Sequence, residues 1–449
     1  MAIRNPARGD LVRGEMLSAE EAAERLGVKL STLYAYVSRG WLKSYRRKVG
    51  RQALYRRTDI DALRGVVAPE RGRRGRALPE ATSWVTVAQP INGDTGSPGV
   101  IVAESAVSSI INGRLFYRGY PVEELAVGAN FEEVCLLLWN GERAEASQLR
   151  SLRAEIYGAR MPSAAASSLA AVGQDAAALV RLIAVMPSLI ALERNHAPRP
   201  RTRQATLIIS ILPLALDQVN GRVLSDAEIG ERGMAARLLT AARQSAEAPL
   251  DWEIAALDQI LIACAEHELN ASTFAARVVA STGADLYASV LAALCSLSGP
   301  IHGGACDRIE RMFSDLAGGL RIDDQLNLFE RERSLPPGFG HAIYPEGDPR
   351  AAMLKRLAGE VARHKGRRVL ELALKIEEAV LKRDRLMPNL DFYLTVCARM
   401  LDFPTGLASA IFALARSAGW IAHGLEQYAD NRLIRPRMRY RGAPIRHWN

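Results

Sequence analysis

The sequence lacks the features that mark disulfide-bonded, metal-binding and membrane proteins. Its five cysteines lie far apart and form no Cys-x-x-Cys pair, so we expect neither a disulfide framework nor a metal site. No apolar run reaches the ~18 residues that a membrane span needs, and the run from Leu207 to Leu216 contains Pro213. The first residues also lack the apolar core of a signal peptide, and we therefore expect a cytoplasmic protein.

Aromatic residues are scarce as well, at 6%, and alternation of polar and apolar residues is rare. Instead, segments rich in alanine and leucine, with helical periodicity, extend from about residue 84 to about residue 425. In this part, strand-like pieces are expected at 84–91, 100–104 and 113–117, and there is no glycine-rich phosphate loop. The 449 residues, 49% of them apolar, predict a mainly α-helical globular protein with two or three domains.

Acidic residues are fewer than basic residues near the N-terminus of the chain. Residues 1–80 hold 18 lysines and arginines against 9 aspartates and glutamates, which accounts for the entire net charge of +9. The sequence therefore predicts a basic N-terminal module on a neutral body. We place the module at residues 1–65, a basic linker containing glycine and proline at 66–83, and the body at 84–449.

The basic module contains start and stop signals of short helices. Ser18 and Glu21 can form a capping box for a helix that stops at Gly27, and a second helix is expected over 32–39. Two short strands around a turn near Gly50 and a third short helix complete the pattern. This segment resembles the winged helix-turn-helix of the excisionase and MerR type, which implies DNA binding through the second helix and the wing.

Lysine and arginine side chains in the second helix and in the wing suit contacts with phosphates. The residues expected to contact DNA are Ser31, Thr32, Tyr34, Arg39, Arg46, Arg47, Lys48 and Arg51. A solvated basic face on a protein-interaction domain is the alternative interpretation of the same residues.

Three turn-rich motifs interrupt the helical body, and each surrounds a residue that can move or hold a proton. Glycines and a proline surround His302 in SGPIHGGA, and His341 follows a similar turn in PPGFGH. Asp391 lies beside two aromatic residues in MPNLDFY. An apolar setting raises the pKa of a carboxyl group, which makes Asp391 a candidate general base.

The neighbours of these motifs add two expectations. A helix is predicted to begin near Ala305, directly after His302, and the positive end of its dipole disfavours imidazolium. A neutral imidazole can donate a hydrogen bond to a developing enolate. Arg350 suits bidentate binding of a carboxylate, and hence a dicarboxylate substrate. The structural alternatives are a turn histidine for His302, a surface ion pair for Arg350 and a helix cap for Asp391.

Together and in this order, the motifs resemble those of citrate synthase. The resemblance covers roughly residues 95–443 and includes GRLFYRGYPVEELA, HELNASTFAARVVAST, ALARSAGWIAH and RLIRPR. It implies a mainly α-helical homodimer, each subunit having a large domain and a smaller, mobile helical domain inserted at roughly 300–400. It also implies condensation of acetyl-CoA with oxaloacetate and water to give citrate and CoA. The coenzyme A thioester is then a co-substrate, and no cofactor is permanently bound.

The resemblance also implies a role for each matching residue. Asp391 takes a proton from the acetyl methyl group, His302 hydrogen-bonds the thioester oxygen and stabilises the enol, and His341 polarises the oxaloacetate carbonyl and acts as acid. The residues expected to bind oxaloacetate are His267, Arg350, Arg416 and Arg435, the last of them in the site of the partner subunit.

The chain departs from the family pattern in several places. Segment 194–213 is basic and polar where aromatic turns are usual, so a surface loop or a different lid is expected there. Pro345 stands where a basic residue often contacts the CoA phosphates, and Cys306 stands where Asn is common. The helix-turn-helix is foreign to the ordinary enzyme.

Two other functions stay open at this point. A 2-methylcitrate synthase uses propionyl-CoA, and a hydrophobic pocket distinguishes one methylene by only about 1–3 kcal/mol. A DNA-binding metabolite sensor could also be built on the same body. His423, in WIAHGLEQ, is expected to be a helix-packing histidine, and no role is assigned to His196, His364 or His447.

Overall fold

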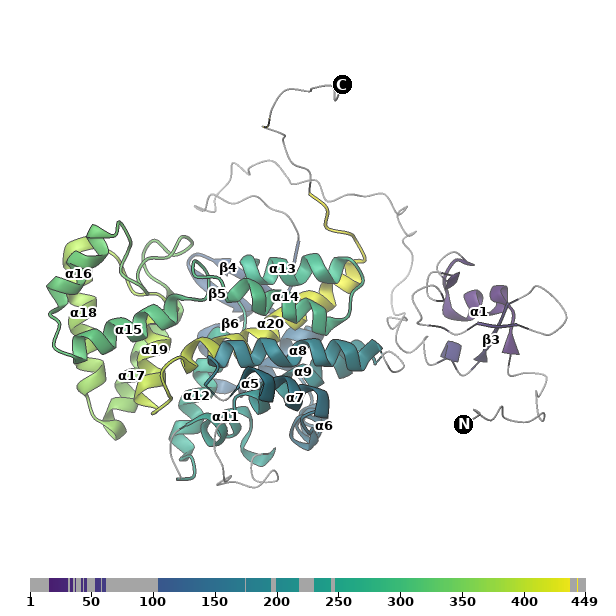
Figure 1. Ribbon diagram of the computed structural model, residues 1–449, viewed down its shortest axis with the longest axis horizontal. Coiled ribbons are helices and arrows are strands. Elements are labelled where there is room, and N and C mark those ends of the chain that lie inside the picture. Colours follow the sequence, from purple (N-terminus) through teal and green to yellow (C-terminus); the bar gives the residue numbers. More distant parts are fainter. Residues whose placement is uncertain are drawn as a thin grey trace. The chain divides into compact units, whose positions relative to one another are not determined.

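The computed structural model (Figure 1) describes the chain in several stretches, which are residues 16–30, 33–34, 37, 42, 44–46, 53–57, 59–61, 104–173, 175–194, 199–217, 230–243, 247–436 and 442. These residues belong to two compact units. The first lies within Met1–Pro79 and Ala191–Arg203, and the second within Glu80–Ile190 and Gln204–Asn449.

The first unit contains the predicted start of the helix-turn-helix. Helix α1 (Ala19–Leu26) begins at a capping box formed by Ser18 and Glu21 and ends at Gly27, whose φ is 70°. Strands β1 (Met16–Leu17), β2 (Tyr45–Arg46) and β3 (Ala53–Arg56) form an antiparallel sheet in the order β1-β3-β2. The small core consists of Ala19, Ala22, Ala23, Leu26, Leu33, Leu42, Tyr55 and Ile60.

Most residues predicted to contact DNA lie outside the described residues, namely Ser31, Thr32, Arg39, Arg47, Lys48 and Arg51. Two of the predicted positions are described. Tyr34 has helical backbone and is 51% exposed, and Arg46 ends strand β2. Tyr34 is therefore accessible to a partner.

The second unit begins with a small antiparallel sheet of β4 (Ser108–Ile111), β5 (Arg114–Tyr117) and β6 (Tyr120–Pro121). The turn between β4 and β5 consists of Asn112 and Gly113, with φ values of 51° and 72°. Positive φ at both central residues is the signature of a type I′ hairpin turn, for which Asn-Gly is a preferred pair. The strand expected at 113–117 is thus present as β5, whereas residues 84–91 and 100–103 lie outside the described residues.

Helices make up nearly all the rest of this unit. The first group comprises α4 (Val122–Gly128), α5 (Phe131–Asn140), α6 (Ala146–Gly158), α7 (Ser163–Val172), α8 (Ala178–Arg194), α9 (Arg201–Ala215), α11 (Met234–Ala242), α12 (Asp251–Cys264), α13 (Ala271–Ser281) and α14 (Leu286–Leu297). The second comprises α15 (Ala305–Ala317), α16 (Ile322–Arg331), α17 (Pro349–Lys365), α18 (Arg368–Asp384), α19 (Leu390–Met400) and α20 (Leu407–Asp430).

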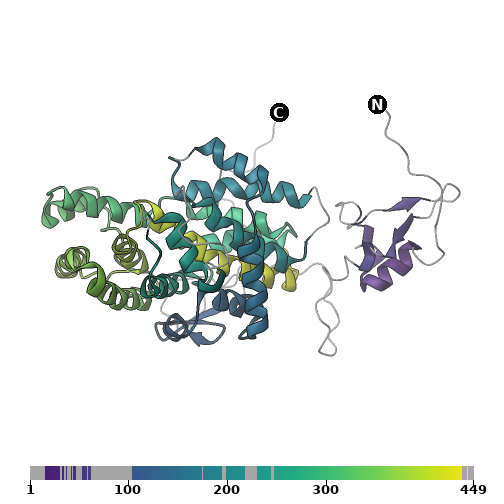
Figure 2. The same ribbon diagram turned by 90° about the horizontal axis from the view of Figure 1, so that it is seen from below.

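Helix α20 forms the centre of the core. It is buried along most of its length, including Trp420, and it packs against α5, α12, α13 and α14. Helices α15 to α19 gather into a lobe at one side of the unit in both views (Figures 1 and 2), with α17 packed on α19 and α16 on α18. Among the described helices, none combines the length and apolarity that crossing a membrane requires.

The prediction of a surface loop at 194–213 was wrong over most of that segment, whereas its role as a lid stays a prediction. Arg194 ends α8, and residues 201–213 lie within α9. Buried side chains follow one another along α9 from Gln204 onwards, because the apolar residues after it outweigh the basic start of the segment. Pro213 lies inside this helix rather than ending it.

Candidate active site

His267 lies in the segment between α12 and α13, where the backbone is tightly held. Its neighbour Glu268 has a φ of 49°, which is uncommon for a residue other than glycine. The amide of Glu268 donates to Ser108 Oγ (3.1 Å), and its carboxylate accepts from the amide of Ile110 (3.0 Å). Asn270 then caps α13 by accepting from the amide of Thr273 (3.0 Å). These contacts with strand β4 and helix α13 therefore fix the backbone position of His267.

Three rings meet at His267. The Nε2 atom of His267 lies 3.0 Å from the hydroxyl of Tyr344, and the ring of His341 lies edge-on at 5.3 Å. Burial, followed by the charges of Arg350 and Arg416, holds the pKa of His267 well below its usual range. Burial and the charge of Arg350 also lower the pKa of His341. Both imidazoles are therefore neutral near pH 7.

The tautomer of His341 follows from its neighbour. Its Nδ1 atom accepts a hydrogen bond from the amide of Ile343 at 3.2 Å, so the ring proton of the neutral imidazole lies on Nε2. His341 therefore presents an N–H donor at Nε2.

Arg350 and Arg416 are the two buried cations of this region. Arg350 forms a bidentate ion pair with Asp348, with N···O distances of 3.0 and 2.8 Å. Burial opposes the charge of Arg350, but the attraction of Asp348 outweighs it and raises the pKa of Arg350. Arg416 donates from Nε to the carbonyl of Cys264 at 2.6 Å, and burial lowers its pKa. Arg350 is thus no surface ion pair, and two buried positive charges converge where an anion can be bound.

His302 stands directly before α15, as predicted, and its Nε2 atom lies 2.9 Å from Ser272 Oγ. Burial and the charge of Arg416 lower the pKa of His302, so this imidazole is neutral too. The glycines of the SGPIHGGA motif allow the backbone to pack closely. A Cβ atom at Gly303 would overlap the carbonyl of Leu297, which only glycine avoids.

Asp391 lies in the first turn of α19, and Asn389 rather than Asp391 is the helix cap. Burial raises the pKa of Asp391 above its usual range, although the charge of Arg350 acts in the opposite direction. Its nearest described donor is the thiol of Cys306, with Sγ 3.9 Å from Oδ1, which is at most a weak hydrogen bond. A carboxylate without a strong donor keeps its basicity.

The loops of His341 and Asp391 are joined to each other. The amide of Gly340 donates to Met387 O (2.8 Å), and the amide of Asn389 donates to Gly338 O (2.9 Å). The side chain of Asn389 also donates to Gly340 O at 3.1 Å. The PPGFGH and MPNLDFY motifs, far apart in the sequence, therefore form one rigid structure.

Six of the seven residues expected at the site come together in this way. They are His267, His302, His341, Arg350, Asp391 and Arg416, joined by the contacts and charge interactions above. Arg435 is exposed in the segment after α20. Pro345 is also exposed, next to the buried Tyr344.

Sequence reasoning missed the hydrogen-bond partners of these groups, which are Ser272, Tyr344 and Asp348. A signal existed only for Asp348, since Asp before Pro is a typical helix start. The side chain of Asp348 caps α17, and the same carboxylate pairs with Arg350.

Neutral imidazoles, buried arginines and a basic carboxylate define a class of site, one whose groups can bind an anion and accept a proton. Comparison with known proteins identifies the family. The citrate synthase C-terminal domain model matches residues 96–437, and a helix-turn-helix domain model matches residues 16–64. Citrate synthase 2 of Bacillus subtilis is 33% identical over 357 residues, covering 77% of this chain and 95% of the relative. The 2-methylcitrate synthase of Shewanella oneidensis is 33% identical over 360 residues, covering 78% and 95%.

Solved structures agree with this assignment. The citrate synthase of Thermotoga maritima matches with a TM-score of 0.65 at 31% identity, over 78% of this chain and 96% of that one. The citrate synthase of Thermoplasma acidophilum, solved with carboxymethyl coenzyme A and oxaloacetate, matches with a TM-score of 0.67 at 26% identity, over 78% and 96%. The chain belongs to the citrate synthase family and carries a helix-turn-helix domain before the family's fold.

Proposed function

We propose that this chain is a citrate synthase-type acyltransferase that condenses acetyl-CoA with oxaloacetate and water to give citrate and CoA. The observation that carries the proposal is the combination at one site of Asp391, whose pKa is raised by burial, with three neutral imidazoles and two buried arginines. Such a set suits a substrate with two carboxylates and a reaction that begins with proton removal from carbon.

In the first step, Asp391 takes a proton from the methyl group of the thioester, and His302 donates a hydrogen bond to the developing enolate oxygen. For His302 to donate from Nδ1, its Nε2 atom must accept the proton of Ser272. Trp420 Nε1 donates to the same hydroxyl oxygen (3.2 Å), and Asn270 Oδ1, 2.8 Å away, competes for its proton. Because the Ser272 hydroxyl donates to Asn270 Oδ1 in this structure, the required tautomer of His302 forms when that hydroxyl turns from Asn270 towards His302.

In the second step, the enolate carbon attacks the ketone carbon of oxaloacetate, the thioester carbonyl is restored, and the negative charge passes to the ketone oxygen. His341 donates its Nε2 proton to that oxygen, while His302 keeps its own proton. The proton that Asp391 took restores His341 through solvent. Arg350 and Arg416 hold the carboxylates with His267, and Arg435 completes the site of the partner in a homodimer. Water then hydrolyses the thioester and releases CoA.

The acyl donor is tested by measuring free CoA thiol, with oxaloacetate present and acetyl-CoA or propionyl-CoA supplied in parallel. Faster oxaloacetate-dependent release from acetyl-CoA supports the proposal. Faster release from propionyl-CoA replaces it with 2-methylcitrate synthesis, and no release from either donor overturns it.

We also propose that the N-terminal module binds DNA in the cytoplasm, which adds a sensor function to the enzyme. The match to a helix-turn-helix domain over residues 16–64 and the concentration of positive charge in residues 1–80 favour this. Deletion of residues 1–80 is expected to abolish salt-dependent DNA binding and to leave turnover nearly unchanged. DNA affinity that survives the deletion contradicts the assignment.

A further inference from the structure

A stripe of α20 contacts three consecutive residues directly before His267. Arg416 Nε donates to Cys264 O (2.6 Å), and the amide of Gly419 donates to Ala265 O (3.1 Å). His423 Nε2 then lies 3.0 Å from Glu266 Oε1. The residues of α20 are three or four positions apart, so they lie on one face of the helix. This face sets the register of the segment that leads into His267.

Glycine is required at the centre of this stripe. A Cβ atom at position 419 would overlap both the carboxylate of Glu266 and the carbonyl of Ala265. Gly419 therefore lets the helix approach the segment closely enough for His423 to reach Glu266.

The proton of His423 can be assigned from its two neighbours. Arg277 Nη1, which can only donate, lies 2.8 Å from Nδ1 of His423. The Nδ1 atom therefore accepts, and Nε2–H donates to Glu266. Arg277 is held in turn by Glu426 (2.6 Å) and by Gln427 (3.1 Å). His423 is thus more than the helix-packing residue expected from the sequence, because it orients a buried carboxylate.

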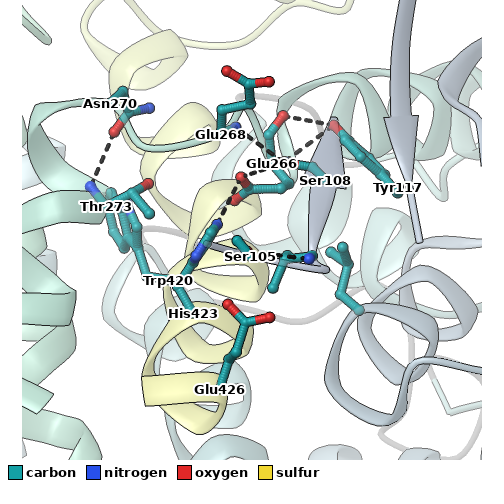
Figure 3. Close-up of polar contacts among 12 residues, drawn as sticks. Ser105, Ser108, Tyr117, Glu266, Glu268, Asn270, Thr273, Trp420, His423 and Glu426 are labelled. Atoms are coloured by element: carbon teal, nitrogen blue, oxygen red, sulfur yellow. Dashed lines mark hydrogen bonds and ion pairs between the residues drawn. The ribbon is translucent and has the colours of Figure 1, made fainter. Parts of the chain in front are cut away.

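Glu266 is fully buried and receives a second donor from the sheet. Ser108 Oγ donates to Glu266 Oε1 at 3.0 Å, and the hydroxyl of Tyr117 accepts from the amide of Glu266 at 3.0 Å. Figure 3 shows Glu266 between His423 on α20 and the strand residues Ser108 and Tyr117. Burial opposes ionisation, but His423, Arg416 and Ser108 together lower the pKa of Glu266. Its carboxylate is therefore a fixed negative charge next to the site.

We propose that Glu266, held by Ser108 and His423, is a positioning residue of the oxaloacetate site that acts through His267 and Arg416. Among the described residues, Glu266 Oε2 has no hydrogen-bond partner, so this oxygen serves through its charge and its close packing on α20. The carboxylate offsets the charge of Arg416 and fixes the segment from which His267 reaches Tyr344. This inference rests on the proposed function for the identity of the ligand.

The test compares Glu266→Ala with Glu266→Gln in the full-length protein. The alanine variant loses both hydrogen bonds, and its KM for oxaloacetate is expected to rise at least about tenfold while its KM for acyl-CoA stays within about twofold. The glutamine variant keeps an acceptor for Ser108 and His423 but lacks the charge that offsets Arg416, so it is expected to recover only part of this loss. Glu310→Ala is the matched control, since Glu310 is also buried and accepts from a backbone amide, that of Gly406. It is expected to change stability and neither KM.

Ser108→Ala, with Ser289→Ala as its buried control, covers the case in which Glu266→Ala does not fold. Ser108→Ala removes one donor to Glu266 and is expected to raise the KM for oxaloacetate several-fold, again without an effect on acyl-CoA. An unchanged KM for oxaloacetate in the variant, or an equal rise of KM for both substrates, overturns the inference. Turnover by the wild-type protein leaves the proposed function intact in that case. If wild-type protein shows no turnover, the proposed function fails, and the shift of thermal unfolding by oxaloacetate in the same variants decides the inference separately.

Discussion

At the scale of single residues, Asp391 combines a function with a cost to the fold. The pKa of Asp391 is raised by burial, so the folded state favours its neutral form. Such a group stabilises the fold below its unfolded pKa, and this contribution is lost as pH rises through the folded pKa. At neutral pH the ionised carboxylate of Asp391 therefore lowers the stability of the fold, and the proposed role as a base requires this ionised form.

Asp391→Asn is expected to lower turnover by about 10³-fold, which is within the range for loss of a general base. The same change is expected to raise the melting temperature at neutral pH, because no buried charge remains. Oxaloacetate affinity should be retained, since the amide replaces the carboxylate without a change of shape. Turnover near the wild-type rate contradicts the role of base, and a lower melting temperature contradicts the account of its burial.

The pH dependence of turnover provides a second prediction at this scale. The pKa values of His267, His302 and His341 are all lowered, first of all by burial, so these rings are neutral at pH 7. Protonation of Asp391 is expected to abolish turnover on the acid side. The midpoint measured from kcat is expected above the ordinary aspartate value of about 3.9. A midpoint at or below that value shows that burial does not tune the base.

The sequence motifs single out the candidate reactive residues, but they do not reveal the partners of these residues. His302, His341 and Asp391 each lie in a short motif that a reader of the sequence can find. The hydrogen bond between His302 and Ser272 joins residues 30 positions apart, and the one that Ser108 donates to Glu266 joins residues 158 apart. Such pairs depend on how helices pack, which local patterns do not encode.

At the scale of elements, the same limit explains the error at 194–213. The basic residues at its start suggested a solvated loop, yet the apolar residues that follow continue as α9. The capping box of α1 and the start of α15 were predicted correctly because caps are local features.

The cap residue of α19 also connects the loops of His341 and Asp391, so its role can be tested by substitution. Asn389 accepts from the amide of Asp391 (3.1 Å) and donates to Gly340 O (3.1 Å). Asn389→Ala is expected to destabilise the protein by about 1 kcal/mol and to lower kcat several-fold, because the loops of His341 and Asp391 separate. Asn130→Ala is the control, since Asn130 caps α5 in the same way through the amide of Glu133 (3.0 Å). Equal losses of kcat in the two variants, measured with their unfolding free energies, refute the link.

At the scale of the whole molecule, the distribution of charge separates the parts of the chain to which the two proposed functions are assigned. The helix-turn-helix lies outside the region shared with the family's enzymes, and residues 1–80 account for the net charge of +9. The body is neutral as a whole, and Arg350 and Arg416 are buried in it. Under the proposed functions, we therefore expect nucleic acid to be attracted to the N-terminal part of the chain and the small dianion to be bound by the body.

Arg435 provides the prediction that requires two subunits. It lies exposed after α20, and we propose that it completes the site of a partner. Asp391→Ala and Arg435→Ala are each expected to be inactive as homodimers. Chains of the two variants are unfolded together in equal amounts and refolded, so that about half of the dimers are mixed. If Arg435 acts across the interface, each mixed dimer contains one site with both defects and one with neither, and about a quarter of wild-type turnover returns. If Arg435 acts within its own subunit, every site keeps one defect and no turnover returns, which refutes the shared site.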